Sequence, residues 1–461
     1  MLKGFEGADF NMSNTHLQVI NTDAFLSFGL NMRRFIFENN EITYIAPKAF
    51  NKFKFVEKIS FKNSNIFKLT NGVFDGTNAD VLDLSQNLLY EVNGIFDGLY
   101  VAKLNLSKNT IKEIEVGAFD RIIFCTGRSS LQIQYLDLSN NLIEMIKPDT
   151  FKCVNPRKCF RVLNLMNNEI TAIENGTFAN LRYLEELRLS SNKITKLHSN
   201  SFKGLLNLNF LYLQNNRIQE IPMGMFGDVQ RLTLLDLSQN FLMSLNGNTF
   251  SGLLTLQILN LSHNNLQDLK NSYLFPLIQL RDLDITNIRI HEIYIKDLLE
   301  THFRMRSLTL NDNFWTCKQL MQIYKEMNHQ FGGFSSPSSY FNVPNLHGIA
   351  CSRGPLPTYE NLTFEKFLNI ISQDHEFTKT LELTMMQKND VPVVNKSIDN
   401  DKSEIINSIH TMFIIFIVIV VISFVYFVIK EVLMWLHNYD FIKSNRLSFL
   451  YTQSSSKIQV L

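Results

Sequence analysis

The sequence predicts an α/β solenoid, a stack of short repeats that share one parallel β-sheet, on three observations. A Leu-x-Leu motif, or an apolar equivalent, recurs twelve times at intervals of mostly 22 to 25 residues. An asparagine follows the second apolar residue of the motif by three positions in ten of the twelve repeats. A phenylalanine follows that residue by thirteen positions in eight repeats, which explains why the chain of 461 residues contains 38 phenylalanines.

The second apolar residue of each motif marks one repeat. The twelve markers are Phe37, Phe61, Leu84, Leu106, Leu138, Leu165, Leu189, Leu213, Leu237, Leu261, Ile285 and Leu310. A unit of about 24 residues cannot bury its leucines alone, so neighbouring repeats must stack into one continuous core. The phenylalanine column is expected to form a spine behind the sheet.

The asparagine explains why the alternating pattern in FLYLQNNRIQEI stops at Asn216. After the strand the chain turns inward, which leaves backbone N–H and C=O groups that need partners. An amide side chain has both donors and an acceptor, so Asn216 can join the backbones of adjacent repeats. We therefore expect a ladder of buried asparagines along the stack.

The repeats LDLSNN, LRLSSN, LYLQNN, LDLSQN and LNLSHN resemble the leucine-rich repeat of extracellular proteins, over residues 10–315. The resemblance is to Toll ectodomains, Slit and insect-like surface leucine-rich proteins. It implies a leucine-rich repeat horseshoe with a parallel sheet on the concave side, which we assign to residues 1–315 as about twelve repeats plus a partial first one.

A membrane anchor is predicted near the other end of the chain. Residues 411–429 contain no charged side chain, and about 20 apolar residues span a bilayer as a helix. We expect a polar stalk at 357–404, a transmembrane helix at 405–429 and a short cytoplasmic tail at 430–461. A tail of that length is too short for a kinase or a Toll-type signalling domain, so signalling would need a partner.

The N-terminus has no apolar signal-peptide region and no cysteine-rich cap. We therefore expect the signal peptide and cap to be missing from this sequence, a short form with unusual targeting being the alternative. The predicted location is the plasma membrane, with a single span, the array outside and the tail in the cytoplasm. A tail-anchored protein with a cytosolic array is a further alternative.

Five cysteines leave at least one unpaired. Cys125 is expected to bond with Cys153 or Cys159, while a Cys153–Cys159 bridge and free thiols are also open. Cys317 follows Asn-x-Phe-Trp and resembles the C-terminal cysteine cap of extracellular leucine-rich proteins. That resemblance implies a cap at 316–356 with a helix from about Cys317 to Asn328 and a Cys317–Cys351 disulfide.

Six Asn-x-Ser/Thr sequences are candidate glycosylation sites, and all precede the predicted membrane helix. They begin at Asn11, Asn105, Asn175, Asn260, Asn361 and Asn395. The repeat consensus itself produces the sequences at Asn105 and Asn260, so Asn361 and Asn395 are the stronger candidates.

The residues between the leucines of each strand should face away from the core. Most are Asp, Asn or Ser, but the middle repeats place apolar residues there, as protein interfaces do. The candidate ligand-binding residues on this concave face are Phe210, Tyr212, Val162, Met166, Leu234, Asp236, Ile258, Glu186 and Arg188. The alternative is that Leu234 and Ile258 only pack along the sheet.

The predicted function is a cell-surface receptor or adhesion protein that binds a protein ligand on its concave face. A non-signalling co-receptor or scaffold, acting through its transmembrane partner, is the second prediction.

The formal net charge of +1 argues against a nucleic-acid partner. No catalytic, cofactor or metal motif occurs, so we expect no enzyme activity, and His291 and His302 are expected to be ordinary surface residues. The oligomeric state is left open.

Overall fold

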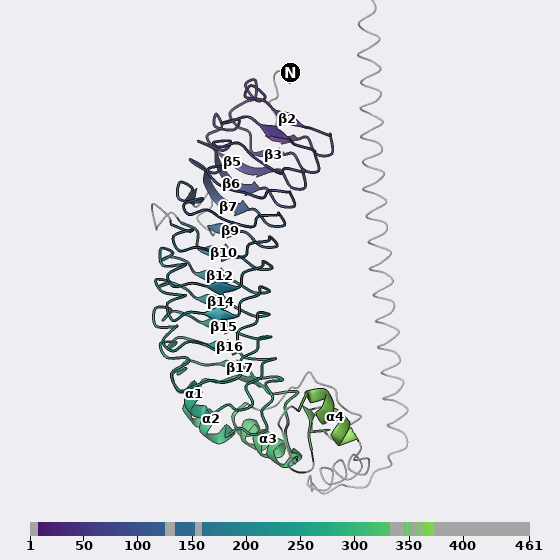
Figure 1. The fold of residues 1–461 in the computed structure, drawn as a ribbon, viewed down its shortest axis with the longest axis vertical. Coiled ribbons are helices and arrows are strands. Elements are labelled where there is room, and N and C mark those ends of the chain that lie inside the picture. The colour runs from purple at the N-terminus through teal and green to yellow at the C-terminus, as the bar shows by residue number, and fades with distance from the viewer. Residues whose placement is uncertain are drawn as a thin grey trace, which may run out of the picture. The chain divides into compact units, whose positions relative to one another are not determined.

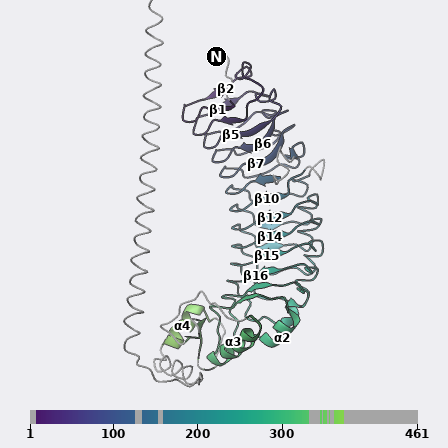
Figure 2. The ribbon, with the colours of Figure 1, turned by 180° about the vertical axis from the view of Figure 1, so that it is seen from behind.

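The computed structural model describes residues 8–124, 134–152 and 159–331, together with 345–346, 349–352, 354, 356 and 362–372. Its main feature is one parallel sheet, to which successive repeats contribute short strands along a curved array (Figures 1 and 2). The predicted solenoid is confirmed. In sheet order the strands are β1 (Asp9–Asn11), β3 (Arg34–Ile36), β5 (Val56–Ser60), β6 (Asn78–Asp83), β7 (Tyr100–Asn105), β9 (Tyr135–Asp137), β10 (Val162–Asn164), β12 (Glu186–Arg188), β14 (Phe210–Tyr212), β15 (Leu234–Asp236), β16 (Ile258–Asn260), β17 (Asp282–Asp284) and β18 (Ser307–Thr309).

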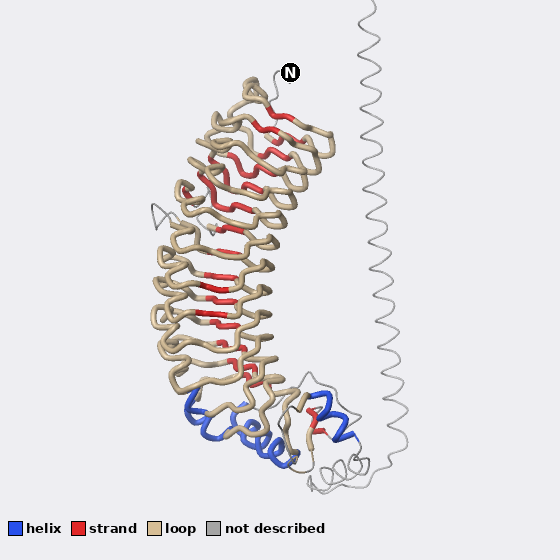
Figure 3. Tube along the Cα trace, viewed as in Figure 1, coloured by secondary structure: helices blue, strands red, loops and turns tan. Residues whose placement is uncertain are grey.

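Turns and short elements connect these strands (Figure 3). Four helices lie in the described C-terminal part of the array and beyond it: α1 (Asn271–Leu274), α2 (Ile295–Thr301), α3 (Cys317–Phe331) and α4 (Phe364–Ser372). The remaining strands each contain two residues: β8 (Ile123–Phe124) beside β7, the parallel pairs β2 (Val19–Ile20) with β4 (Tyr44–Ile45) and β11 (Ala172–Ile173) with β13 (Lys196–Leu197), and the antiparallel pair β19 (Asn345–Leu346) with β20 (Ile349–Ala350).

The phenylalanine spine runs behind the sheet as predicted. The rings of Phe74, Phe96, Phe119, Phe151 and Phe178 stack in turn, with centroids 6.0 to 6.4 Å apart and planes within 16° of parallel. All five side chains are buried, as are the leucines on the inner side of the strands. Burial of each such side chain contributes about 1.5–3 kcal/mol, so the spine is a major source of the array's stability.

The asparagine ladder is also present. Asn216 donates from Nδ2 to the carbonyls of Leu189 and Leu213, each at 2.9 Å, and its Oδ1 accepts the N–H of Ile194 at 3.1 Å. One side chain therefore joins three backbone groups from two repeats. Equivalent buried asparagines with bonds of this kind lie at 40, 87, 109, 141, 168, 192, 240, 264 and 313.

One residue of the asparagine doublet has a separate backbone role. Asn215, which precedes the ladder residue, has φ of 56°. The left-handed region is tolerated by asparagine better than by most residues, so it suits the turn at the end of the strand. The doublet Asn215-Asn216 thus combines a turn residue with a buried bridge.

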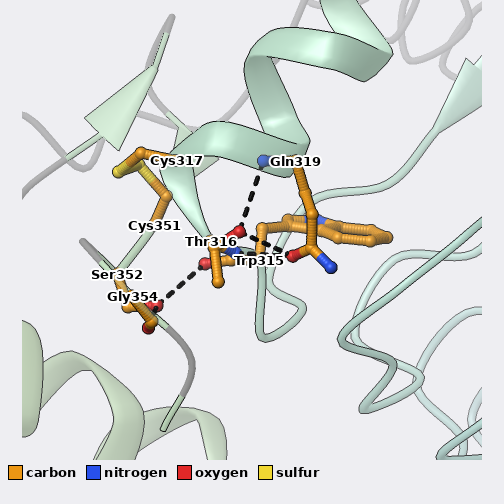
Figure 4. Close-up of a disulfide and its surroundings, with 7 residues drawn as sticks. All are labelled: Trp315, Thr316, Cys317, Gln319, Cys351, Ser352 and Gly354. Carbon is orange, nitrogen blue, oxygen red and sulfur yellow. Dashed lines mark hydrogen bonds between the residues drawn. A yellow bond between two sulfur atoms is a disulfide. The ribbon is translucent and has the colours of Figure 1, made fainter.

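The C-terminal cap starts with a disulfide and with hydrogen bonds that stabilise the first turn of α3 (Figure 4). Cys317 and Cys351 are bonded, which agrees with the pairing implied by the cap resemblance. Thr316 precedes α3; its Oγ1 accepts the N–H of Gln319 at 3.3 Å, and Gln319 Oε1 accepts the N–H of Thr316 at 3.1 Å. This reciprocal pair is a capping box, so the sequence Thr-Cys-Lys-Gln fixes where the helix starts.

Two features of the C-terminal part differ from the sequence-based expectations. Part of the predicted polar stalk, residues 364–372, forms α4, whose Phe367 and Ile371 are buried with Phe314 at the end of the array. His302 is buried, not on the surface, and its Nε2 lies 3.0 Å from the carbonyl oxygen of Leu274. The amphipathic sequence TFEKFLNII explains the first difference, and the position of His302 directly after α2, beside the last residue of α1, explains the second.

The predicted membrane helix at 405–429 lies outside the described residues, as does the tail at 430–461. Within the described ranges, no helix has both the length and the apolar character that crossing a bilayer requires. Cys125 and Cys153 also lie outside the described residues. Cys159 is disulfide-bonded, which leaves Cys125 and Cys153 as the two possible partners.

Candidate functional site

The candidate site lies on the open face of the sheet, defined as the side whose residues point away from the leucine core. The strand register aligns these residues in rows that cross the repeats. The first row contains Tyr135, Val162, Glu186, Phe210, Leu234, Ile258 and Asp282, and the central row contains Asp137, Asn164, Arg188, Tyr212, Asp236, Asn260 and Asp284. The predicted ligand-binding residues of the strands are therefore neighbours.

Most of the central row has a structural role that the sequence analysis missed. The side-chain oxygen of Asp137 accepts the N–H of Ser139, two residues later, at 2.9 Å. Residues with the same contact are Asn11, Asp83, Asn105, Asn164, Asp236, Asn260 and Asp284. Short polar side chains favour such local bonds to the backbone. The recurring Asp/Asn-Leu-Ser in the sequence was the signal that could have revealed this.

Toward the N-terminus the central row continues through Asn105, Asp83, Ser60, Ile36 and Asn11, so Ile36 and Ser60 also depart from the Asp/Asn pattern. From Asp83 to Asp284 the row of short Asp and Asn residues is interrupted at two adjacent positions. Arg188 and Tyr212 occupy the central row between Asn164 on one side and Asp236 on the other. Neither side chain is a short acceptor of the Asp or Asn type, so neither can replace the local bond to the backbone. The structural requirement of the row therefore does not explain these two residues.

Arg188 is held in place from two sides. Its Nε donates to Glu186 Oε1 at 2.5 Å, and its guanidinium lies 6.0 Å from the centre of the Tyr212 ring. Burial alone would lower the pKa of Arg188, but the hydrogen bond and charge of Glu186 raise the pKa above its ordinary value. The result is a fixed cation over an aromatic ring, with Glu186 partly neutralising it.

Phe210 and Tyr212 provide an aromatic surface on β14. The Phe210 side chain is 38% exposed, which is high for a phenylalanine within the sheet of the array. Tyr212 is half-buried, and burial, followed by the nearby charge of Glu186, raises the pKa of its hydroxyl. The hydroxyl therefore stays protonated at neutral pH and can donate a hydrogen bond to a partner.

The neighbouring strand β15 and the next strand add apolar and acidic groups. Leu234 is half-buried and Ile258 is 39% exposed, so both extend the apolar first row beside Phe210. Burial raises the pKa of Asp236, and the charge of Asp284 raises it further. No side-chain cation pairs with the carboxylate of Asp236 among the described residues.

On the N-terminal side of these residues, the first row of the open face is not accessible to a ligand at β10. Val162, predicted as a contact residue, is only 6% exposed and is not available to a ligand. It lies in the first row between Tyr135 and Glu186, whose larger side chains shield it. The Tyr135 hydroxyl donates to Asp137 Oδ2 at 3.0 Å, and burial, together with the Asp137 charge, raises the pKa of Tyr135 to about 12.

The third outward position of each repeat is also less open than predicted. Met166 and Gln214 are half-buried there, whereas the serines at 139, 190, 238 and 262 are buried. The ladder asparagines bind the backbone carbonyls of these serines, which draws the chain inward. The candidate contact surface is thus Met166, Glu186, Arg188, Phe210, Tyr212, Leu234, Asp236 and Ile258, which we call the central patch.

The structure describes four of the six candidate glycosylation sites. Asn11, Asn105, Asn175 and Asn260 lie within the described residues, and Asn361 and Asn395 lie outside them. No group of three His, Cys, Asp or Glu side chains that could hold a metal ion occurs in the described ranges.

Comparison with known proteins identifies the repeats. The leucine-rich repeat family matches residues 160–218, 207–266 and 230–290, a BspA-type leucine-rich repeat region of six copies matches 7–126, and a further leucine-rich repeat family matches 132–154. Tsukushi of Mus musculus is 28% identical over 205 residues, which are 44% of this chain and 49% of Tsukushi. Toll-like receptor 3 of Boselaphus tragocamelus is 36% identical over 87 residues, or 19% of this chain and 10% of the receptor.

Two solved structures share the fold. The structure of a TLR13–ssRNA13 complex superposes with a TM-score of 0.57 at 22% identity, over 67% of this chain and 44% of that one. The leucine-rich repeat domain of APL1B superposes with a TM-score of 0.52 at 19% identity, over 75% of this chain and 94% of that one. The chain spans about half the length of Tsukushi and much less of the receptor, so these similarities establish leucine-rich repeats and not a shared ligand.

Proposed function

We propose that this leucine-rich repeat protein binds a protein partner through the central patch, with Phe210 and Tyr212 at the middle of the contact. The observation that carries the proposal is the interruption of the central row at Arg188 and Tyr212. Tyrosine and arginine are common among residues that dominate binding energy at protein interfaces. The patch combines both with an exposed phenylalanine and a charged rim.

The charges around the patch favour a protein over a nucleic acid. The central row carries carboxylates at Asp83, Asp137, Asp236 and Asp284, and Asp282 lies beside them in the first row. A phosphate backbone would be repelled by this row, because nucleic-acid binding requires neutralisation of phosphates by Lys and Arg. A protein segment with an apolar side chain for Phe210 and a cation for Asp236 would complement the patch.

We further propose that the array is displayed outside the cell by a single membrane helix at 405–429, between a stalk and a cytoplasmic tail. The uncharged sequence at 411–429 supports the anchor, and the disulfide Cys317–Cys351 supports an oxidising compartment. The receptor names of two relatives are consistent with a surface role. For the chain expressed behind an added cleavable secretion signal, antibody access to an N-terminal tag on intact cells tests the orientation, and staining only after permeabilisation would reject it.

The binding proposal can be tested with the full-length chain displayed on cells and screened against secreted and surface proteins. For any saturable partner, Phe210→Ala combined with Tyr212→Ala should weaken binding at least ten-fold, which is about 1.4 kcal/mol. Phe241→Ala is the matched control, because Phe241 is 48% exposed but lies outside the strands of the sheet. A partner that binds wild type and the double variant equally would reject the central patch.

A further inference from the structure

Three candidate glycosylation sites, Asn11, Asn105 and Asn260, lie in the central row, and the last two flank the central patch, Asn260 on the strand of Ile258. Asn105 ends β7 and Asn260 ends β16. The Oδ1 of each asparagine accepts the N–H of the serine two residues later, Ser107 or Ser262, at 3.0 Å. Because the oxygen of each amide is turned to the backbone, its nitrogen points away from that contact. Both side chains are half-exposed.

The amide nitrogens of these two residues are available, unlike those of the ladder asparagines. Among the described residues, neither Asn105 nor Asn260 donates a hydrogen bond from Nδ2. By contrast, the ladder residue Asn264 donates to the carbonyls of Leu237 and Leu261. Asn164, which occupies the same row, donates to the Tyr135 hydroxyl at 3.1 Å and is followed by Met166, not by Ser or Thr.

We infer that Asn105 and Asn260 carry N-linked glycans, which border the central patch and restrict what can reach it. Attachment through Nδ2 would break no hydrogen bond of the described structure and would leave the contact to Ser107 or Ser262 in place. The inference rests on the proposed exposure of the array to the secretory pathway. It assigns a role to two sites that the repeat consensus alone would otherwise explain.

The space between the two sites limits the size of the partner. Five strands, β9, β10, β12, β14 and β15, separate β7 from β16 in the sheet. Six steps of about 4.8 Å place the two asparagines about 29 Å apart, and the glycans themselves occupy part of that width. A domain of 100 residues, with a radius of gyration of about 13 Å, is about 34 Å across as a uniform sphere and would not fit, whereas a helix about 10–12 Å across would. The partner therefore presents a single helix or loop to the patch.

The test is site-specific mass spectrometry of the full-length chain from eukaryotic cells, expressed as it stands and behind an added cleavable secretion signal. With the added signal, we expect glycans on Asn105 and Asn260. Ser107→Ala and Ser262→Ala should each remove one glycan, since these changes destroy the acceptor sequence and keep the asparagine and its backbone contact. Asn175 is exposed and lies outside the sheet, so it serves as the accessible control.

Because the added signal directs the chain to the secretory pathway, the outcomes test this inference independently of the proposed location. Occupied Asn175 with unmodified Asn105 and Asn260 would overturn the inference, as would the absence of all three glycans behind the added signal. Glycans on Asn105 and Asn260 only with the added signal would support the inference and agree with the expectation that the signal peptide is missing from this sequence. For a protein that binds wild type in the screen above, Ser262→Ala should not weaken binding, because the glycan borders the patch. A ten-fold loss would contradict that border role.

Discussion

Two polar columns run along the array, and they differ in regularity. The inner column is the asparagine ladder, in which ten buried side chains make the same bonds to the backbone of adjacent repeats. The outer column is the central row of the open face, where Asp and Asn bind the backbone two residues later. Both columns have exceptions toward the ends of the array: Ser64 and Ile288 in the ladder, and Ile36 and Ser60 in the central row. Through the middle repeats the ladder is unbroken, whereas the central row is interrupted at Arg188 and Tyr212.

The difference distinguishes polar side chains that the fold requires from polar side chains that are available for binding. A buried amide that joins two repeats cannot be exchanged without leaving backbone groups unpaired, so its regularity follows from the fold. From Asp83 to Asp284 the central row is half-exposed except at the buried Asn164, so at positions 188 and 212 water can replace the local bond to the backbone. An exception in the row costs little stability, which leaves Arg188 and Tyr212 free to serve a partner.

The largest expected loss of stability comes from a substitution in the asparagine ladder. Asn216→Leu removes the partners of Leu189, Leu213 and Ile194, and each buried group left unpaired costs about 1–3 kcal/mol. We expect a loss of about 3–5 kcal/mol in the free energy of unfolding, measured by denaturant titration. Gln219→Leu in the same repeat is the exposed control and should change stability by less than about 0.5 kcal/mol. An unchanged melting temperature for Asn216→Leu would refute the ladder's structural role.

A smaller change in stability is expected when Arg188 and Tyr212 are replaced by the asparagine that is typical of the central row. Arg188→Asn together with Tyr212→Asn introduces side chains that can accept the N–H two residues later, as Asn260 does. We expect the free energy of unfolding to change by less than about 1 kcal/mol, because the lost contacts of Arg188 are half-exposed. Thermal unfolding monitored by circular dichroism measures this. A loss as large as that of Asn216→Leu would mean that both columns are structural.

The smallest effect concerns Asp236 and depends on pH. Burial raises its pKa in the folded chain above the ordinary value of 3.8, so the folded state binds this proton more tightly than the unfolded state. Ionisation of Asp236 as the pH rises through that window therefore lowers stability. Asp236→Asn avoids this cost and can still accept the Ser238 N–H, so the variant should be at least as stable as wild type at pH 7.

The comparison of melting temperatures at pH 7 and pH 4 checks this sign. The advantage of Asp236→Asn should shrink as the pH falls and wild-type Asp236 becomes protonated. An advantage that grows toward low pH would contradict the direction of the shift and show that ionised Asp236 stabilises the folded chain.

Periodicity predicted most of the fold because each repeat makes the same contacts. The sheet, the asparagine ladder and the phenylalanine spine all follow from residues at fixed spacing, and the predicted Cys317–Cys351 bridge is present. The exposure of residues on the open face was harder to predict, since the alternating pattern gives only the side of the sheet to which a residue points. Val162 is closed by the larger residues beside it, and exposure of that kind depends on neighbours from other repeats. The burial of His302 likewise depends on the contact of its ring with the carbonyl of Leu274 in the preceding repeat, which no repeat spacing encodes.

The central claim is that the interruption of the central row exists for binding and not for stability. Its most direct test is the dissociation constant of the Arg188→Asn/Tyr212→Asn variant for a protein partner found with the wild-type chain, with Phe241→Ala as the control. We predict at least a ten-fold loss of affinity for the double variant, an unchanged affinity for the control and little change in the melting temperature of either. Wild-type affinity in the double variant would contradict the claim.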